Sequence, residues 1–274
     1  MNYLICRKGN DETKILLDEI KLIMVNSTQV SITTCLLAEL LEKKIKIIFV
    51  DSKHNPAGEL VPYQNNYYSY RKIKEQINFD NYNKDYLWKF IIQHKILNQA
   101  KNLFYMKLNQ QYEMLIQYQN DVDNGDITNR EGHSAKVYFN ALFGTSFTRD
   151  DRKNDINKYL NYGYSILLSS INREIKSCGY LTELGIHHIG ESNPFNLSCD
   201  FIEPLRPLVD YLVISRQVDE QNYKQKFVEM LTMSVKYNGK DIYLDNAIHL
   251  YVEDLLNYLK NGEEERISFI EYEL

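Results

Sequence analysis

The spacing of hydrophobic residues changes about a quarter of the way along the chain. Before residue 65, short apolar and β-branched runs separated by turn residues predict strands at 20–25, 30–33 and 45–50. Residues 34–43 carry apolar side chains at helical spacing and predict a short helix packed on these strands. We therefore expect a β-rich domain over residues 1–65.

A segment rich in Pro, Asn and Tyr follows and extends to about residue 80, which is typical of a linker. Beyond it the period becomes helical, most clearly over 86–108. Further helices are predicted at about 110–119, 129–143, 155–178, 200–215, 223–237 and 245–260. The expected fold class is α+β, with a small N-terminal β-rich domain followed by a larger all-α domain over 66–274.

The composition is that of a soluble protein of the cytoplasm. A chain of 274 residues can bury a substantial core. Its four cysteines form no CxxC pair, so we expect reduced thiols and neither a zinc ribbon nor a disulfide framework. No stretch approaches the roughly 18 uninterrupted apolar residues of a membrane span, and we expect no membrane association.

Charge is unevenly distributed along the chain. The formal net charge is −5, but residues 217–274 hold twelve acidic and six basic residues, a net of −6. Residues 126–180 hold eight basic and six acidic residues, a weak positive patch that suits DNA phosphates or is simply a mixed surface. The candidate DNA-binding residues in this patch are Arg130, Lys136, Arg149, Arg152, Lys153 and Arg173.

Glu131 is the first candidate metal ligand. It stands three residues after Thr128, a spacing that equally predicts a capping box at the start of the helix 129–143. His133 lies two positions further on and points elsewhere on a helix, so other ligands must come from another segment.

That second segment holds two histidines and two acids. His187 and His188 lie in a glycine-bounded loop, and spacing alone does not decide between them. Asp200 and Glu203 are three residues apart and share a helix face with Arg206, although they would also fit a helix cap and a surface ion pair. Two carboxylates with one imidazole suit Mg²⁺ or Mn²⁺.

The motifs around these residues resemble one protein family. They are NREGHSA at 129–135, YFNALFG at 138–144, NDINKYLNYGYSILL at 154–168 and FNLSCDFIEPLRPLVD at 195–210. Together they resemble the Cas1 family of CRISPR-associated integrases, in its type II-A branch. The resemblance implies an N-terminal β domain and an α-helical catalytic domain.

The resemblance also implies which residues form the site. Glu131, His188 and Glu203 would be the catalytic metal ligands, with Asp200 as an acidic neighbour. His188 is preferred because it precedes Asp200 by twelve residues, the spacing of the family motif. Beyond the resemblance, we expect Arg206 to orient Glu203 and Tyr162 or Tyr164 to line a DNA channel.

Three functions are compatible with these residues. In an integrase, the 3′-hydroxyl of a short duplex attacks a phosphodiester at the boundary of a CRISPR repeat, with one Mg²⁺ or Mn²⁺ at the site. A metal-dependent endonuclease acting on branched or single-stranded DNA would use the same residues with water as nucleophile. A non-catalytic DNA-binding scaffold would need Glu131 only as a helix cap.

Partners follow from the resemblance as well. It implies double-stranded DNA, a homodimer, a Cas2 dimer that bridges two such dimers, and association with Csn2 and Cas9. Type II-A relatives usually carry an additional opening strand before the segment that corresponds to residues 2–9. A truncated N-terminus would expose a sheet edge and weaken the dimer contact, and a misassigned start codon is the alternative explanation.

Overall fold

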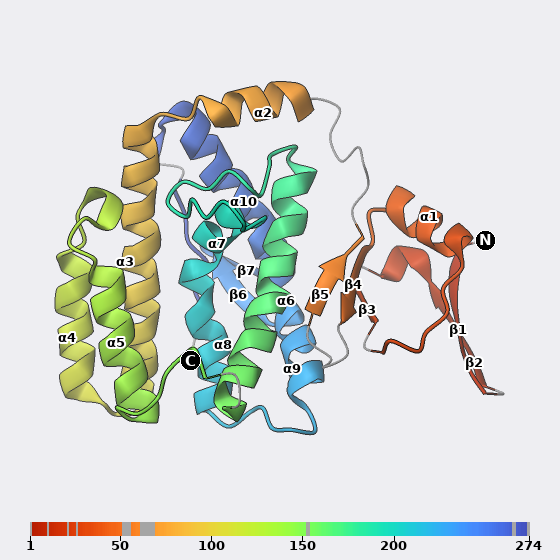
Figure 1. Cartoon of the computed structure of the whole chain (residues 1–274), viewed down its shortest axis with the longest axis horizontal. Coiled ribbons are helices and arrows are strands. Elements are labelled where there is room, and N and C mark those ends of the chain that lie inside the picture. Colours follow the sequence, from red (N-terminus) through yellow and green to blue (C-terminus); the bar gives the residue numbers. More distant parts are fainter. Residues whose placement is uncertain are drawn as a thin grey trace. The chain divides into compact units, whose positions relative to one another are not determined.

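The computed structural model describes residues 2–9, 11–20, 22–25, 27–50, 56–60, 69–151, 154–264 and 267–272. The chain divides into two compact units, residues 1–65 and 66–274 (Figure 1). In the described part, no helix is both long and apolar enough to cross a membrane.

The first unit is built around a short mixed sheet. β3 (Leu22–Val25) pairs parallel with β4 (Lys46–Val50), which pairs antiparallel with β5 (Pro56–Glu59). The crossover between β3 and β4 contains α1 (Thr34–Glu42), whose first turn is capped by the Thr33 hydroxyl. A separate hairpin joins β1 (Tyr3–Lys8) to β2 (Asp11–Leu16) and leads into a short 3₁₀ turn, Leu17–Glu19.

The predicted strands at 20–25 and 45–50 are confirmed, but the one at 30–33 is wrong. Parallel strands need a crossover connection, and residues 27–33 belong to it. Val30 is 53% exposed there, so its β-branched side chain packs on no sheet. A core of Leu17, Leu40, Ile45 and Ile47 holds the unit together.

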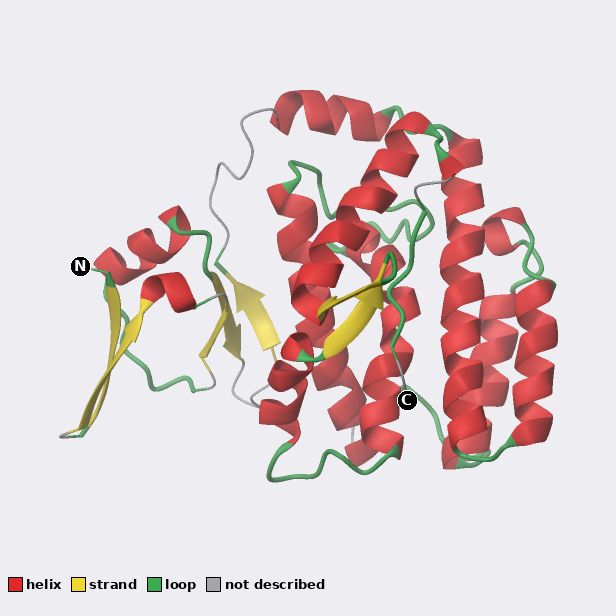
Figure 2. Ribbon diagram, turned by 180° about the vertical axis from the view of Figure 1, so that it is seen from behind, coloured by secondary structure: helices red, strands yellow, loops and turns green. Residues whose placement is uncertain are grey.

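The second unit is mainly helical (Figure 2). Its helices are α2 (Ser69–Ile77), α3 (Asn81–Tyr105), α4 (Asn109–Asn120), α5 (Arg130–Phe143), α6 (Asp155–Ser177), α7 (Asn196–Ile202), α8 (Arg206–Ile214), α9 (Tyr223–Glu229) and α10 (Leu244–Asn261). Short 3₁₀ turns occur at Asn124–Asp126, Glu203–Leu205 and Met230–Thr232. α3 packs against α4, α5, α7, α8 and α10, and α6 packs against α7 to α10, so these two long helices form the centre of the core.

The predicted order, strands first and helices after, is confirmed. Two details differ from the prediction. α2 lies in the segment predicted as linker, of which residues 61–68 fall outside the described part of the chain. The helix predicted over 223–237 ends at Glu229, and β6 (Ser234–Tyr237) and β7 (Lys240–Tyr243) form a hairpin.

The hairpin has a local cause. Its turn, Asn238–Gly239, has positive φ at both residues, 50° and 74°. Asn-Gly favours this two-residue turn because both residues tolerate the left-handed region. The dipeptide was therefore a sequence signal for a hairpin that the apolar spacing obscured.

Candidate active site

Glu131 and Glu203 converge on the ammonium group of Lys95. Lys95 Nζ lies 2.6 Å from Glu131 Oε1 and 2.5 Å from Glu203 Oε2. The three side chains come from α5, from the 3₁₀ turn after α7 and from the middle of α3. The side chains of Glu131, Glu203 and Lys95 are 25%, 4% and 10% exposed, so the contact is largely shielded from water.

Glu131 is positioned by the start of α5. The carboxylate of Asp126 accepts hydrogen bonds from the backbone N–H groups of Arg130 (2.8 Å) and Glu131 (3.0 Å). Asn129 occupies the N-cap position with φ of 54°, and its side chain accepts from Gly132 N. The predicted capping box beginning at Thr128 is therefore wrong, because Asp126 and Asn129 supply the capping oxygens.

Glu203 stands where the predicted helix 200–215 breaks. Pro204 and Pro207 lack backbone N–H groups, and the chain passes from α7 through a 3₁₀ turn into α8. Asn98 of α3 donates to the carbonyl of Pro204 at 2.9 Å, fixing the turn against α3. Arg206 Nε lies 2.9 Å from Glu203 Oε1, so the Glu203–Arg206 ion pair is present, but Glu203 is buried and the pair is not on the surface.

His188 is held by Asp200. Its Nδ1 lies 2.7 Å from Asp200 Oδ1, and the same carboxylate accepts from the backbone N–H groups of Ile186, His187 and His188. A side chain on Gly185 would lie 2.2 Å from the His188 carbonyl oxygen, so the loop requires glycine there. No hydrogen bond to Nε2 of His188 occurs within the described residues, and this nitrogen is available to a ligand.

The two histidines have different environments. His187 stacks on Trp88, with ring centroids 4.1 Å apart and planes at 6°, whereas the His188 and Trp88 rings are T-shaped, with centroids 5.7 Å apart. The hydrogen bond to Asp200 raises the pKa of His188; burial opposes this shift, and the two glutamates add to it. The imidazole of His188 is thus within electrostatic reach of both glutamates.

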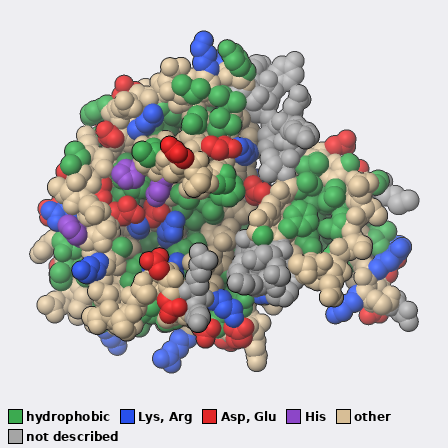
Figure 3. All heavy atoms as spheres, in the orientation of Figure 1, with side chains coloured by type: hydrophobic (Ala, Val, Ile, Leu, Met, Phe, Trp, Pro, Cys, Tyr) green, Lys and Arg blue, Asp and Glu red, His purple; other side chains and the backbone are tan. Residues whose placement is uncertain are grey.

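At this contact, the negative charge of Glu203 and the positive charge of Lys95 stabilise each other. Burial opposes ionisation of Glu203, but Arg206 and Lys95 outweigh it and hold the pKa of Glu203 below its ordinary value. Burial likewise opposes the charge of Lys95, and Glu203 and Glu131 outweigh it and raise the pKa of Lys95. Both side chains are therefore charged near neutral pH. Figure 3 shows histidine, acidic and basic side chains gathered on one face of the helical unit.

As they stand, no three His, Cys, Asp or Glu side chains of the described residues are close enough to hold a metal ion. The donor set nevertheless suits a hard divalent ion. Two carboxylates already share one cation, and the His188 imidazole, whose pKa both of them raise, has Nε2 available while Asp200 orients Nδ1.

The family follows from comparison with known proteins. The family model for CRISPR associated protein Cas1 matches residues 2–246. The chain belongs to the Cas1 family. A CRISPR-associated endonuclease Cas1 of Neisseria meningitidis serogroup C is 36% identical over 211 residues, which cover 77% of this chain and 69% of that protein.

Solved structures share the fold of this Cas1 family member. A casposase bound to its integration product matches with a TM-score of 0.75 and 21% identity, over 94% of this chain and 85% of that one. A Cas6-RT-Cas1–Cas2 complex matches with a TM-score of 0.74 and 20% identity, over 97% of this chain and 34% of a longer chain. At these identities the likeness establishes the fold alone.

In this Cas1 chain, the tyrosines predicted to line a DNA channel are core residues. Tyr162 is 1% exposed and packs on Tyr223 and Phe227. Tyr164 is 8% exposed and donates a hydrogen bond to Asp210. Tyr162 packs toward α9 and Tyr164 toward α8, so both rings are taken up by packing inside the helical unit.

The predicted DNA-binding residues are in different situations. Lys136 is exposed on α5. Arg130 lies over the Tyr118 ring. The guanidinium of Arg149 donates hydrogen bonds to two asparagines of α6, Asn157 and Asn161. Arg173 is engaged by Glu174 and Asp245 at 2.6 and 2.5 Å, so its guanidinium is satisfied within the protein. Arg152 and Lys153 lie outside the described residues.

Three residues of the site belong to none of the predicted motifs: Lys95, Trp88 and Asp126. A signal for Lys95 existed, because it follows Trp88, Ile91 and Ile92 at the three- and four-residue spacing of the buried face of α3. A lysine on a buried face needs a charged partner.

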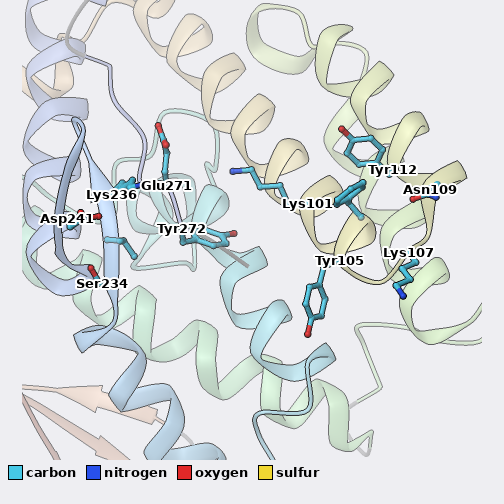
Figure 4. A pocket seen from close by; sticks show the side chains of 12 residues that line it. Lys101, Tyr105, Lys107, Asn109, Tyr112, Ser234, Lys236, Asp241, Glu271 and Tyr272 are labelled. Carbon is cyan, nitrogen blue, oxygen red and sulfur yellow. The ribbon is translucent and has the colours of Figure 1, made fainter.

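A cavity of about 1390 Å³ lies elsewhere in the helical unit (Figure 4). It is lined from the end of α3, the start of α4, the β6–β7 hairpin and the segment around Tyr272. None of the candidate ligands lines it, so this cavity is not part of the candidate site.

Proposed function

We propose that the protein is a CRISPR adaptation integrase that inserts short duplex DNA into a CRISPR array. In this proposal a DNA 3′-hydroxyl attacks a phosphodiester at the repeat boundary. The observation that carries it is the convergence of Glu131 and Glu203 on one cation beside an oriented His188, in a chain of the Cas1 family. A casposase bound to an integration product shares the fold, which favours the same reaction class.

Glu131, Glu203 and His188 Nε2 would hold one Mg²⁺ or Mn²⁺. When bound, such an ion neutralises charge that develops on the phosphoryl oxygens and on the attacking and leaving oxygens. The remaining residues prepare this donor set. Asp200 fixes the His188 ring, Arg206 holds one oxygen of Glu203, and Asp126 fixes the first turn of α5 beneath Glu131.

The type II-A assignment and the partners belong to the proposal too. A structural relative is a Cas1–Cas2 complex, which supports Cas2 as a partner. Double-stranded DNA, a homodimer, a cytoplasmic location and association with Csn2 and Cas9 are proposed from the resemblance of the motifs.

Strand transfer tests the proposal. Wild type and Glu131→Ala are each mixed with Cas2, Mn²⁺, a labelled duplex with free 3′-hydroxyls and a supercoiled plasmid that carries the leader and repeat. We expect wild type to join the label to the repeat boundary and Glu131→Ala to lose at least about 10²-fold in rate. Glu113→Ala, an exposed glutamate on α4, is the control and should behave as wild type.

The same experiment separates the alternatives. The related Neisseria protein is named an endonuclease, so hydrolysis is the second candidate. Cleaved DNA without joined label would indicate hydrolysis with water as nucleophile. DNA binding with neither product, in a folded wild type, would identify a scaffold and refute the integrase proposal.

A further inference from the structure

We propose that Lys95 is a displaceable cation, which occupies the position between Glu131 and Glu203 in the metal-free protein and withdraws when a divalent ion binds. The inference rests on the metal site of the proposed function and adds a competitor to it. Lys95 would then determine how tightly the site binds metal.

The contacts of Lys95 are those of a bound cation. Its ammonium lies 2.6 Å from one oxygen of Glu131, to which it donates a hydrogen bond, and 2.5 Å from one oxygen of Glu203, as in a close ion pair. No other ion pair of Lys95 occurs within the described chain, so both of its contacts would be contested by a metal. The same two carboxylates are the negative groups that any divalent ion at this site would need.

Charge balance makes simultaneous occupancy unfavourable. Glu131 and Glu203 carry two negative charges, and Lys95 and Arg206 offset both of them without a metal. A divalent ion shared by the two carboxylates would lie beside the ammonium in a region where Lys95 is only 10% exposed. Repulsion there is weakly screened, so one cation must leave.

Lys95 is better suited to leave than Arg206. Its compact charge stands on four flexible methylene groups, and Glu131 at its outer side is 25% exposed, which provides a route toward water. Arg206 is also held over the Tyr164 ring at 5.0 Å. Withdrawal of Lys95 would leave Arg206 to orient Glu203 in the loaded site.

The first test measures Mn²⁺ binding by calorimetry at neutral pH. Lys95→Met removes the competitor while keeping the length of the side chain, and we expect it to bind Mn²⁺ at least about tenfold more tightly than wild type. Lys89→Met, the same change on the same helix at a lysine without an ion pair among the described residues, should match wild type. Equal or weaker binding by Lys95→Met would overturn the inference.

A second test uses the wild-type protein and does not depend on the variant folding. Reductive methylation with mass spectrometry reports which lysine amines reach solvent. We expect Lys95 to be protected without metal and modified when Mg²⁺ saturates the site, while Lys89 reacts equally in both. Protection of Lys95 in both states would overturn the inference.

The two hypotheses fail differently. If wild type binds Mn²⁺ and Glu131→Ala does not, the metal site is established, and an unchanged affinity of Lys95→Met refutes only the displacement. If wild type and Glu131→Ala are equally unable to bind Mn²⁺, the metal-dependent function and the inference both fall.

Discussion

Glu203 and Asp210 both bury a carboxylate in the helical unit, but their partners differ. Glu203 meets two cations, Lys95 and Arg206, and its pKa is lowered despite burial. Asp210 accepts hydrogen bonds from the hydroxyls of Tyr138 and Tyr164, and burial raises its pKa to about 6 even though these bonds oppose the shift. Neutral donors leave a buried carboxylate easy to protonate, whereas cations keep it ionised and ready to bind metal.

The largest expected effect tests the charged member of this pair. Glu203→Gln leaves Lys95 and Arg206 without their shared buried counter-charge, and we expect the free energy of unfolding to fall by about 3–5 kcal/mol. Urea unfolding without metal measures this. Glu229→Gln removes one partner of an exposed ion pair with Lys226 and should cost below about 1 kcal/mol. Equal losses in the two variants would show that the buried contact has no special weight.

The second prediction tests the neutral member. Because Asp210 has a folded pKa of about 6 against an ordinary value of 3.8, the folded state binds more protons between these values. The contribution of Asp210 to the free energy of unfolding is therefore greatest below about pH 4. It falls by about 3 kcal/mol as the pH rises through 6. Asp210→Asn stays neutral, so its stability relative to wild type should increase from pH 4 to 7. A difference that is constant with pH would contradict the assignment.

A smaller effect is expected where a carboxylate acts through a histidine. Asp200→Asn weakens the hold on His188, so Mn²⁺ affinity should fall by about 10- to 100-fold. The pKa of His188, followed by NMR, should fall as well, because the Asp200 carboxylate raises it. Glu191→Gln, an exposed change in the same loop, is the control. An unchanged His188 pKa in Asp200→Asn would exclude this positioning role.

The smallest effect concerns the cap of α5. Asp126→Ala removes the acceptor for two backbone N–H groups and should cost about 1 kcal/mol of unfolding free energy. Asp126→Asn keeps one oxygen acceptor and should cost less. Thermal unfolding of both variants measures the difference, and the reverse order would assign the cost to lost packing.

Local pattern accounts for the parts of the fold that the sequence predicted. The long apolar stripe of 86–108 identified α3, and the motifs located Glu131, His188 and Glu203 on three separate segments. Repeats of three to four residues are properties of neighbouring positions, so they are visible without knowing the tertiary contacts. The strand at 30–33 failed because β propensity without a sheet partner does not make a strand.

By itself, the sequence determined the order of strands and helices and the chemical types of the candidate ligands. Only the tertiary structure decided which of them share a cation, because Lys95 meets Glu131 and Glu203 across long stretches of chain. The tertiary structure also places Asp200 in hydrogen-bond contact with His188, and it buries Tyr162 and Tyr164 in the core. The physical reason is that burial and charge pairing depend on segments brought together by packing, and local spacing carries no information about that geometry.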